Sequence, residues 1–266
     1  MPVASADVFD MGQGLQSLET VHVGNAGNFA DSTGFGAVDY EYNIGKYEVT
    51  AGQYTEFLNA VGSTDTYGLY NAEMWTDTKC CKIERTGTPG NYSYSVSGSM
   101  ADRPVNYVNW GDAARFANWL HNGQPTGGQT MQTTEDGAYF INGATGDYDL
   151  LNIALEDDWQ WAVTSENEWY KAAFHKNDGA TNHYFDYPTG TDAIDITMAN
   201  YNDSYSHPID VGSYSWPSPY GTYDQGGNIV EWNEAVIGDV RGLRGGSYQM
   251  YDYFLKVTVR NYYYDP

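Results

Sequence analysis

Glycine and tyrosine are so frequent in this chain that they limit the folds open to it. The 266 residues include 30 glycines and 25 tyrosines but only 9 phenylalanines. Glycine favours turns and interrupts helices, and tyrosine keeps a polar hydroxyl at the tip of its ring, which suits positions near the surface. The composition therefore argues against a helical bundle and predicts a loop-rich fold, in one large domain or two small ones.

Three helix starts can be placed within this loop-rich chain. Thr50 is followed by Gln53, and Ser165 by Glu168, at the spacing of a capping box, in which two side chains satisfy free backbone N–H groups. Asn109 is the expected N-cap of a third helix. The apolar stripes expected to be buried are Tyr54, Phe57, Leu58 and Val61 on the first helix, Ala113, Phe116, Ala117 and Leu120 on the second, and Trp169, Ala172 and Ala173 on the third.

The charge balance excludes some partners and favours others. Thirty-five acidic residues against 12 basic ones give a net charge of -23, which repels phosphate backbones and anionic membranes. No nucleic-acid partner is expected, and no apolar run approaches the roughly 20 residues of a membrane span. The acidic excess favours divalent cations, calcium above all, although a solubilising surface charge explains it equally well.

The two cysteines of the chain, Cys80 and Cys81, are adjacent. An ordinary disulfide requires a Cα separation of about 4.4 to 6.8 Å, so neighbouring cysteines are poorly placed to bridge each other. Free thiols, a strained local bond and pairing between chains all remain open. Cysteine usage therefore does not identify the compartment.

Four segments together resemble one known family. They read GKYEVTAGQYTEFLNAV, RPVNYVNWGDAARFANWLHN, WAVTSENEWYKAAFHK and DQGGNIVEWNEAVIGDVRGLRGGSYQMYDYFLKV. They resemble the formylglycine-generating enzymes, also called sulfatase-modifying factors. The resemblance implies an α+β, irregular, C-type-lectin-like fold with short strands and about three short helices. It implies a single domain over residues 21–266. In residues 1–20, Gly12 and Gly14 interrupt any helical period, so an extended, intermolecular arm is expected there.

The same resemblance implies one or two calcium ions. The ligands that it assigns by position are Asp224, Gly227, Ile229, Glu231 and Glu48 at a first site, and Asn200 and Tyr201 at a second. Carboxylates and backbone carbonyls are the oxygen ligands that calcium prefers, and a double glycine lets carbonyls turn inward. The alternative is that Asp224 and Glu231 only cap or pair with the local backbone, as acidic residues beside glycines often do.

The catalytic cysteines of that family are absent. Its members use two cysteines after a Gly-Gly-Ser sequence to hold copper and to react with substrate, and Met250 and Leu255 occupy these positions here. Neither side chain can act as a thiolate, so no copper is expected. The motifs of serine hydrolases, zinc proteases and phosphate loops are also missing. The chain is therefore predicted not to be an enzyme; the alternative is an enzyme of this family with altered oxidase chemistry.

Tyrosines near the C-terminus predict a binding face. Its members are Tyr248, Tyr251, Tyr253, Tyr262, Tyr263 and Tyr264. Tyrosine offers a large, stiff contact area with a hydroxyl at its end, which suits protein and glycan partners. The alternative is that half of these rings fill the core.

The ends of the chain suggest a second mode of interaction. The family continues beyond the position of Pro266 with a further strand, so an open sheet edge is expected here. The arm at 1–20 of another copy could pair with it and build a filament. The predicted function is thus structural or adhesive work at the cell surface or outside the cell, by self-assembly or by binding a protein or glycan. The signal peptide of such a protein would have been removed.

Overall fold

The computed structural model describes residues 17–260, which fall into two compact units. Unit 1 contains the described residues of 17–49, 164–235 and 242–260, and unit 2 contains 50–163 and 236–241. Most of the arm predicted at 1–20 lies outside the described residues, as do Tyr262, Tyr263 and Tyr264. The prediction of a single domain over 21–266 stays a prediction.

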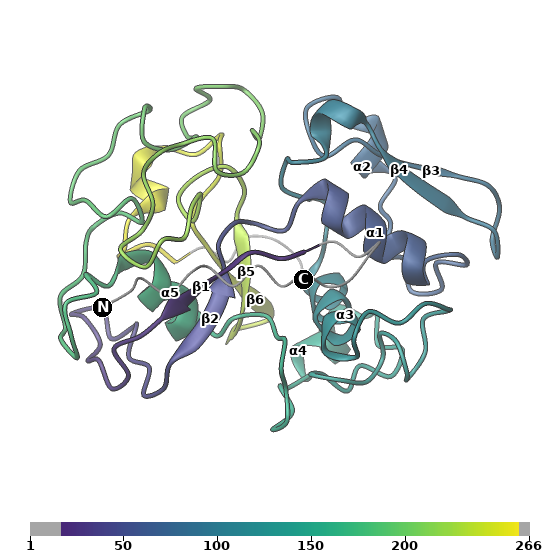
Figure 1. Ribbon diagram of the computed structural model, residues 1–266, viewed down its shortest axis with the longest axis horizontal. Coiled ribbons are helices and arrows are strands. Elements are labelled where there is room, and N and C mark those ends of the chain that lie inside the picture. The colour runs from purple at the N-terminus through teal and green to yellow at the C-terminus, as the bar shows by residue number, and fades with distance from the viewer. Residues whose placement is uncertain (1–16, 261–266) are drawn as a thin grey trace. The chain divides into compact units, whose positions relative to one another are not determined.

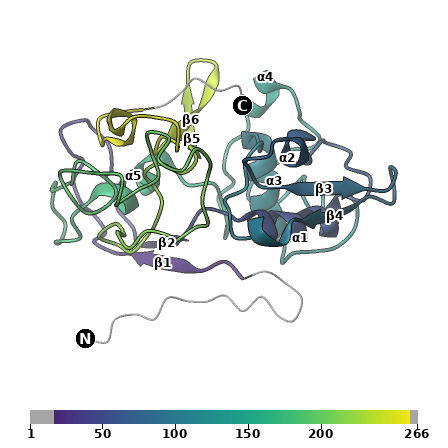
Figure 2. The ribbon, with the colours of Figure 1, turned by 90° about the horizontal axis from the view of Figure 1, so that it is seen from above.

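Unit 1 contains a short antiparallel strand pair covered by a helix. Strands β1 (Thr20–Val23) and β2 (Tyr42–Gly45) lie side by side, with Val21 opposite Ile44 (Figures 1 and 2). Helix α5 (Glu166–Phe174) begins at Ser165, whose side chain accepts a hydrogen bond from Glu168 N, and the predicted capping box is confirmed. The hydrophobic cluster that joins these elements consists of Val23, Val38, Tyr42, Ile44, Ala172 and Tyr220.

The other face of α5 packs on the C-terminal part of unit 1. Trp169, Tyr170, Ala173 and Phe174 form a second cluster with Val257. Strands β5 (Glu231–Ile237) and β6 (Val240–Arg244) pair with each other, and a short 3-10 helix, η2 (Asp252–Leu255), follows. Most of the remainder of unit 1 is loop, as the glycine content predicts.

Unit 2 is built on two helices that begin where the sequence predicts. Helix α1 (Ala51–Val61) and helix α3 (Trp110–His121) have capping boxes at Thr50 and Asn109. Rings from both helices form an aromatic cluster, with Phe57 contacting Phe116 at 5.3 Å and Trp119 at 5.3 Å between ring centroids. The predicted stripes are buried except at Ala113, which is half-buried.

Shorter elements complete unit 2. They are α2 (Glu73–Thr76), strands β3 (Ile83–Thr86) and β4 (Ser93–Val96), the 3-10 helix η1 (Gly98–Met100) and α4 (Asp147–Leu151). Strands β3 and β4 form an antiparallel hairpin. The observed mixture of short helices and short strands among long loops confirms the predicted fold class.

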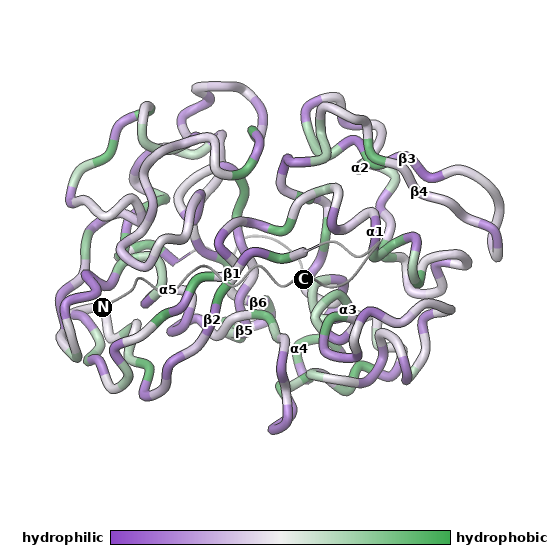
Figure 3. The backbone as a smooth tube through the Cα atoms, viewed as in Figure 1, coloured by the Kyte–Doolittle hydropathy of each residue, from purple (hydrophilic) through white to green (hydrophobic). Residues whose placement is uncertain are grey.

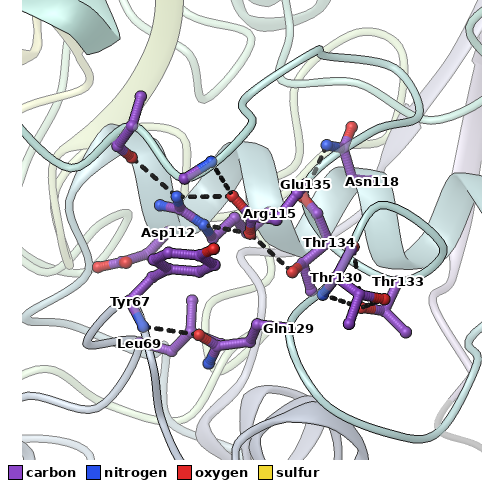
Figure 4. A network of polar contacts seen from close by, with 12 residues as sticks. Tyr67, Leu69, Asp112, Arg115, Asn118, Gln129, Thr130, Thr133, Thr134 and Glu135 are labelled. Carbon is purple, nitrogen blue, oxygen red and sulfur yellow. Dashed lines mark hydrogen bonds and ion pairs between the residues drawn. The ribbon is translucent and has the colours of Figure 1, made fainter.

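A buried polar network stabilises the loop that follows α3. The Arg115 guanidinium donates hydrogen bonds to both carboxylate oxygens of Glu135, at 2.8 and 3.0 Å, and to Ala144 O. Thr134 and Gly143 also donate to Glu135, and the ring of Tyr67 lies over the guanidinium (Figure 4). The hydrogen bonds of this arginine–glutamate pair therefore hold together loop backbone that belongs to no strand or helix.

Hydrophobic residues are distributed in short segments along the chain. Figure 3 shows these green segments separated by purple, hydrophilic ones in both units. Within residues 17–260, no helix combines the length and the hydrophobicity needed to cross a bilayer. The core is therefore divided among several small clusters.

Candidate functional site

Three acidic side chains predicted as calcium ligands lie in unit 1, where Glu48 is buried and the other two are half-buried. Glu48 follows β2, Asp224 lies in a loop, and Glu231 is the first residue of β5. Glu48 accepts hydrogen bonds from Asn228 Nδ2 at 2.7 Å and Ile229 N at 3.2 Å. Asp224 accepts one from Gly212 N at 2.6 Å and Glu231 one from the Trp169 indole at 2.7 Å. Uncharged donors thus contact each carboxylate.

Burial and mutual repulsion favour the protonated forms of these groups. Burial raises the pKa of Glu48 well above its ordinary value, and the charges of Asp224 and Glu231 add to this effect. Burial raises the pKa of Asp224 to about 6. Burial, with a smaller contribution from the charge of Asp224, raises the pKa of Glu231 to about 7. A cation bound beside the three carboxylates would therefore offset the cost of holding them in their charged forms.

A calcium ion at these carboxylates would also need backbone oxygens. Among the residues that the structure describes, no group of three or more His, Cys, Asp or Glu side chains is arranged to hold a metal ion. Calcium is bound by carbonyl as well as carboxylate oxygens, so the predicted Gly227 and Ile229 carbonyls are essential members of such a site. The first calcium site thus fits in the type of its donors, and it stays a prediction.

Three loops meet beside these carboxylates and form what we call the loop junction, residues 199–203, 225–228 and 245–250. Its backbone hydrogen bonds run from Gly227 N to Gly245 O (3.0 Å), Asn228 N to Asn200 O (2.8 Å), Tyr248 N to Asn228 O (3.0 Å), Asp203 N to Tyr248 O (2.7 Å) and Asn202 N to Met250 O (2.8 Å). Main-chain hydrogen bonds therefore position Tyr248 and Met250 in the segment after the Gly-Gly-Ser sequence.

Glycine permits this close approach of backbones. Gly227 has φ of +87°, and a Cβ atom there would lie 2.2 Å from Asn200 O. Gly245 has φ of +94°, and its Cβ would lie 2.7 Å from Gln225 O. Both the left-handed conformation and the lack of space exclude other residues without rearrangement. The double glycine that suggested a metal loop, Gly226–Gly227, thus has a demonstrable role in packing.

Asn228 connects the loop junction to the three carboxylates. Its side chain donates to Glu48 and to Ile209 O, and it accepts hydrogen bonds from Ile209 N and from the side chain of Asn200. Nothing in the sequence pattern distinguished Asn228 from the many other asparagines of the chain. Trp169, the donor to Glu231, was predicted only as a core residue.

The residues predicted for a second calcium site lie within the junction. Asn200 is 2% exposed, and its side chain donates to His207 O and Asn228 Oδ1 and accepts from Ser204 Oγ. Tyr201 is buried against Leu255 in a hydrophobic cluster. Asn200 therefore orders the surrounding loops by direct hydrogen bonds, and the second calcium site stays a prediction.

The predicted tyrosine face is partly solvent-exposed. Tyr251 is 66% exposed and Tyr253 is 60% exposed, whereas Tyr248 is half-buried. Between the two exposed rings, Asp252 accepts a hydrogen bond from the buried Tyr187 hydroxyl at 3.4 Å. Burial and the Asp252 charge raise the pKa of Tyr187 to about 12, so this phenol keeps its proton at neutral pH. The Tyr187–Asp252 pair was not recognised from the sequence.

The positions predicted for catalytic cysteines have different surroundings. Leu255 is 1% exposed and packs with Tyr187, Ala199 and Tyr201, so it fills the core of unit 1. Met250 is half-buried, and its carbonyl belongs to the loop junction.

Both cysteines of the chain are buried in unit 2 as free thiols. The Cys80 thiol donates to Asp77 Oδ2 at 3.2 Å. Burial, reinforced by Asp77, raises the pKa of Cys80, and burial raises that of Cys81. Neutral, buried thiols are poor nucleophiles and poor metal ligands.

Solved structures with the same fold cover almost the whole chain. Treponema denticola variable protein 1 matches with a TM-score of 0.61 and 19% sequence identity, over 95% of this chain and 91% of that protein. The structure titled CarF matches with a TM-score of 0.57 and 20% identity, over 93% of each chain. At these identities the likeness establishes the fold.

A curated relative corrects the prediction that this chain is not an enzyme. The sequence is 22% identical over 253 residues to hercynine oxygenase of Mycobacterium tuberculosis, and the match spans 83% of this chain and 48% of that protein. Because an oxygenase is among its relatives, the prediction is wrong. It relied on Met250 and Leu255, whose identities exclude thiolate chemistry at two positions but not other chemistry on the same fold.

The family itself is identified by a match over most of the sequence. The model described as "Sulfatase-modifying factor enzyme 1-like domain" matches residues 25–264. This span includes the three carboxylates, the loop junction and the segment that carries Met250 and Leu255. The chain therefore belongs to the sulfatase-modifying factor enzyme 1-like family.

Proposed function

We propose that this chain is an oxidative enzyme of its family, acting on a substrate held against segment 247–255 in a reaction that does not use cysteine thiolates. The observation that carries the proposal is the loop junction. Three of its backbone hydrogen bonds, made by Tyr248 and Met250, fix the start of the segment that corresponds to the family's catalytic residues. A pre-positioned backbone is what an active site requires, because substrate and reacting groups must be held in a defined geometry.

The side chains of this segment suggest how a substrate would be held. Tyr251 and Tyr253 offer exposed rings, and the Asp252 carboxylate between them is anchored by the Tyr187 hydroxyl. Tyr187 holds a proton that it can share with Asp252 or with a ligand bound there. Dioxygen, as the oxidant of an oxygenase, would accept the electrons that the substrate loses.

The relative's printed name supplies the first substrate to test. That relative is named hercynine oxygenase, and hercynine is therefore a candidate substrate for this chain. The chain spans about half the length of the relative. We would measure dioxygen consumption by the purified protein with and without hercynine. A parallel reaction would contain a cysteine peptide and copper, the substrate type that the family resemblance implies.

Two aspartate variants make the assay specific. Asp252→Asn removes the charge beside the exposed tyrosines, and substrate-dependent dioxygen uptake should fall at least about tenfold, in the range of losses seen when a positioned polar group is removed. Asp157→Asn is the matched control, because Asp157 is an exposed aspartate of unit 2. Absence of substrate-dependent uptake in both reactions, or equal loss in the two variants, would count against the proposal.

Calcium binding at Glu48, Asp224 and Glu231 is a separate proposal about the stability of this site. The support is the placement of three mutually repelling carboxylates, one buried and two half-buried, among uncharged donors. A divalent cation held by them and by neighbouring carbonyls would offset that repulsion. Calcium would supply charge compensation and no redox chemistry.

Chelation tests the calcium proposal directly. Removing a ligand that binds the folded state lowers the melting temperature. A free calcium concentration of 100 times Kd would stabilise the folded state by about 2.7 kcal/mol. We expect EGTA to lower the melting temperature of the wild type, and Glu231→Gln to abolish this shift. Glu156→Gln, which changes an exposed acid, should retain it. A wild-type melting temperature that EGTA leaves unchanged would exclude the site.

A further inference from the structure

Basic residues are absent from a long acidic part of the sequence. No lysine or arginine occurs between Lys176 and Arg241. The same stretch contains many aspartates and supplies two of the three loops of the loop junction. The carboxylates of this stretch therefore have no lysine or arginine neighbours within it, and the basic group that lies near is Lys256, whose ammonium is 5.8 Å from the ring centroid of Tyr187.

Exposed tyrosines and aspartates from two loops of the junction are brought together on this surface. Hydrogen bonds from Asp203 N to Tyr248 O and from Asn202 N to Met250 O hold the loops side by side. Tyr205 is 53% exposed, and Asp203 and Asp252 are exposed. We call the set formed by Asp203, Tyr205, Tyr251, Asp252 and Tyr253 the tyrosine–acid surface.

The loop that carries Tyr205 is held in an unusual conformation. Asn202, Asp203 and Ser206 have φ of +55°, +55° and +59°, a region that residues other than glycine rarely adopt. Tyr205 contacts Tyr214 edge to face at 6.5 Å between ring centroids, and the Tyr214 hydroxyl donates to Ile196 O. Contact with Tyr214 thus restrains the exposed Tyr205 ring, which lowers the entropic cost of binding a ligand against it.

We propose that the tyrosine–acid surface binds the lysine or arginine side chains of a basic polypeptide segment. Cations are attracted to the faces of tyrosine rings and to carboxylates, and this surface presents both. Each of its three tyrosines is more than half exposed, which suits an extended chain lying across the surface better than a small molecule enclosed in a cavity. The proposal concerns binding and does not depend on the reaction proposed above.

Binding can be measured by fluorescence anisotropy with two labelled peptides. One is a twelve-residue peptide of alternating lysine and serine, and the other has glutamate in place of lysine. We expect the lysine peptide to bind and the glutamate peptide not to bind. Because a net charge of -23 attracts any cationic peptide, charge preference alone does not establish the site.

Tyrosine variants separate the site from the overall charge. Tyr251→Ala and Tyr253→Ala should each weaken the lysine peptide about two- to fivefold, the size of an exposed cation–π contact, and the double variant about tenfold. Tyr148→Ala removes a tyrosine of unit 2 that is 80% exposed and leaves the net charge unchanged, so its affinity should equal that of the wild type.

The outcomes of this experiment are distinct. Equal affinities for wild type, the double variant and Tyr148→Ala would show attraction by net charge only and would overturn the proposal. Failure of the lysine peptide to bind would overturn it as well. Competition by free lysine amide as strong as by the peptide would show a small-molecule cation site and exclude a polypeptide partner. Dioxygen uptake is not involved in any of these readouts, so the proposed enzymatic activity is tested separately.

Discussion

Replacing Gly227 by alanine is predicted to destabilise the protein more than any effect of its backbone conformation can explain. The new Cβ would lie 2.2 Å from Asn200 O, whereas ordinary contact begins at 3.4 Å. The oxygen would have to retreat by roughly 1 Å or more, and its hydrogen bond from Asn228 N, now 2.8 Å, would lengthen. The substitution therefore disrupts a backbone hydrogen bond at the centre of the loop junction.

The expected magnitude is the sum of three effects. A left-handed conformation costs a non-glycine residue about 1 to 2 kcal/mol. Overpacking adds about 1 to 3 kcal/mol, and the weakened backbone hydrogen bond about 1 kcal/mol. We expect Gly227→Ala to lower the free energy of unfolding by about 3 to 6 kcal/mol.

Gly34 provides a matched control for the conformational effect. Its φ is +89°, against +87° for Gly227, both residues belong to unit 1, and a Cβ at Gly34 would meet no atom within 4 Å. Gly34→Ala should therefore cost only about 1 to 2 kcal/mol. Urea unfolding followed by tryptophan fluorescence measures both variants. Equal destabilisation of the two would refute the role of the loop junction as a rigid backbone contact.

Two further predictions concern unit 2. Burial raises the pKa of Asp112 from 3.8 to about 7, so the folded state binds the extra proton between these values. Stability should accordingly fall as pH rises from 4 to 7, by up to about 4 kcal/mol, and Asp112→Asn should flatten this dependence in urea titrations; equal slopes would contradict it. Glu135→Gln leaves the buried Arg115 without its counter-charge and should cost about 3 to 5 kcal/mol, whereas Arg115→Met with Glu135→Leu should cost less by the same measurement.

Local signals in the sequence predicted the local structure of this protein well. Thr50, Asn109 and Ser165 each cap a helix, because a cap depends on side chains only three residues apart. The short helices α2 and α4 are not among the three helices that the sequence predicts. With four and five residues, they are too short for a periodic pattern to appear.

The candidate site depended on contacts that no sequence pattern contains. Glu48 meets Asn228 across 180 positions, and Trp169 meets Glu231 across 62. The family resemblance indicated the carboxylates, but the partners that hold them became evident only in three dimensions. The error about enzymatic function had another cause, because the identities at Met250 and Leu255 describe one reaction mechanism and not all those that a scaffold can support.

The loop junction also affects how this protein could be altered. Its hydrogen bonds join main-chain atoms, including those of Tyr248 and Met250, and such bonds can form whatever side chains these positions carry. Replacing them should leave the backbone path intact, and a library randomised at these positions should yield mostly folded proteins. Residues 248–253 are in this sense exchangeable, whereas the glycines of the junction and the buried Leu255 are fixed. New ligands or new reactivity could be selected there without redesigning the remainder of the chain.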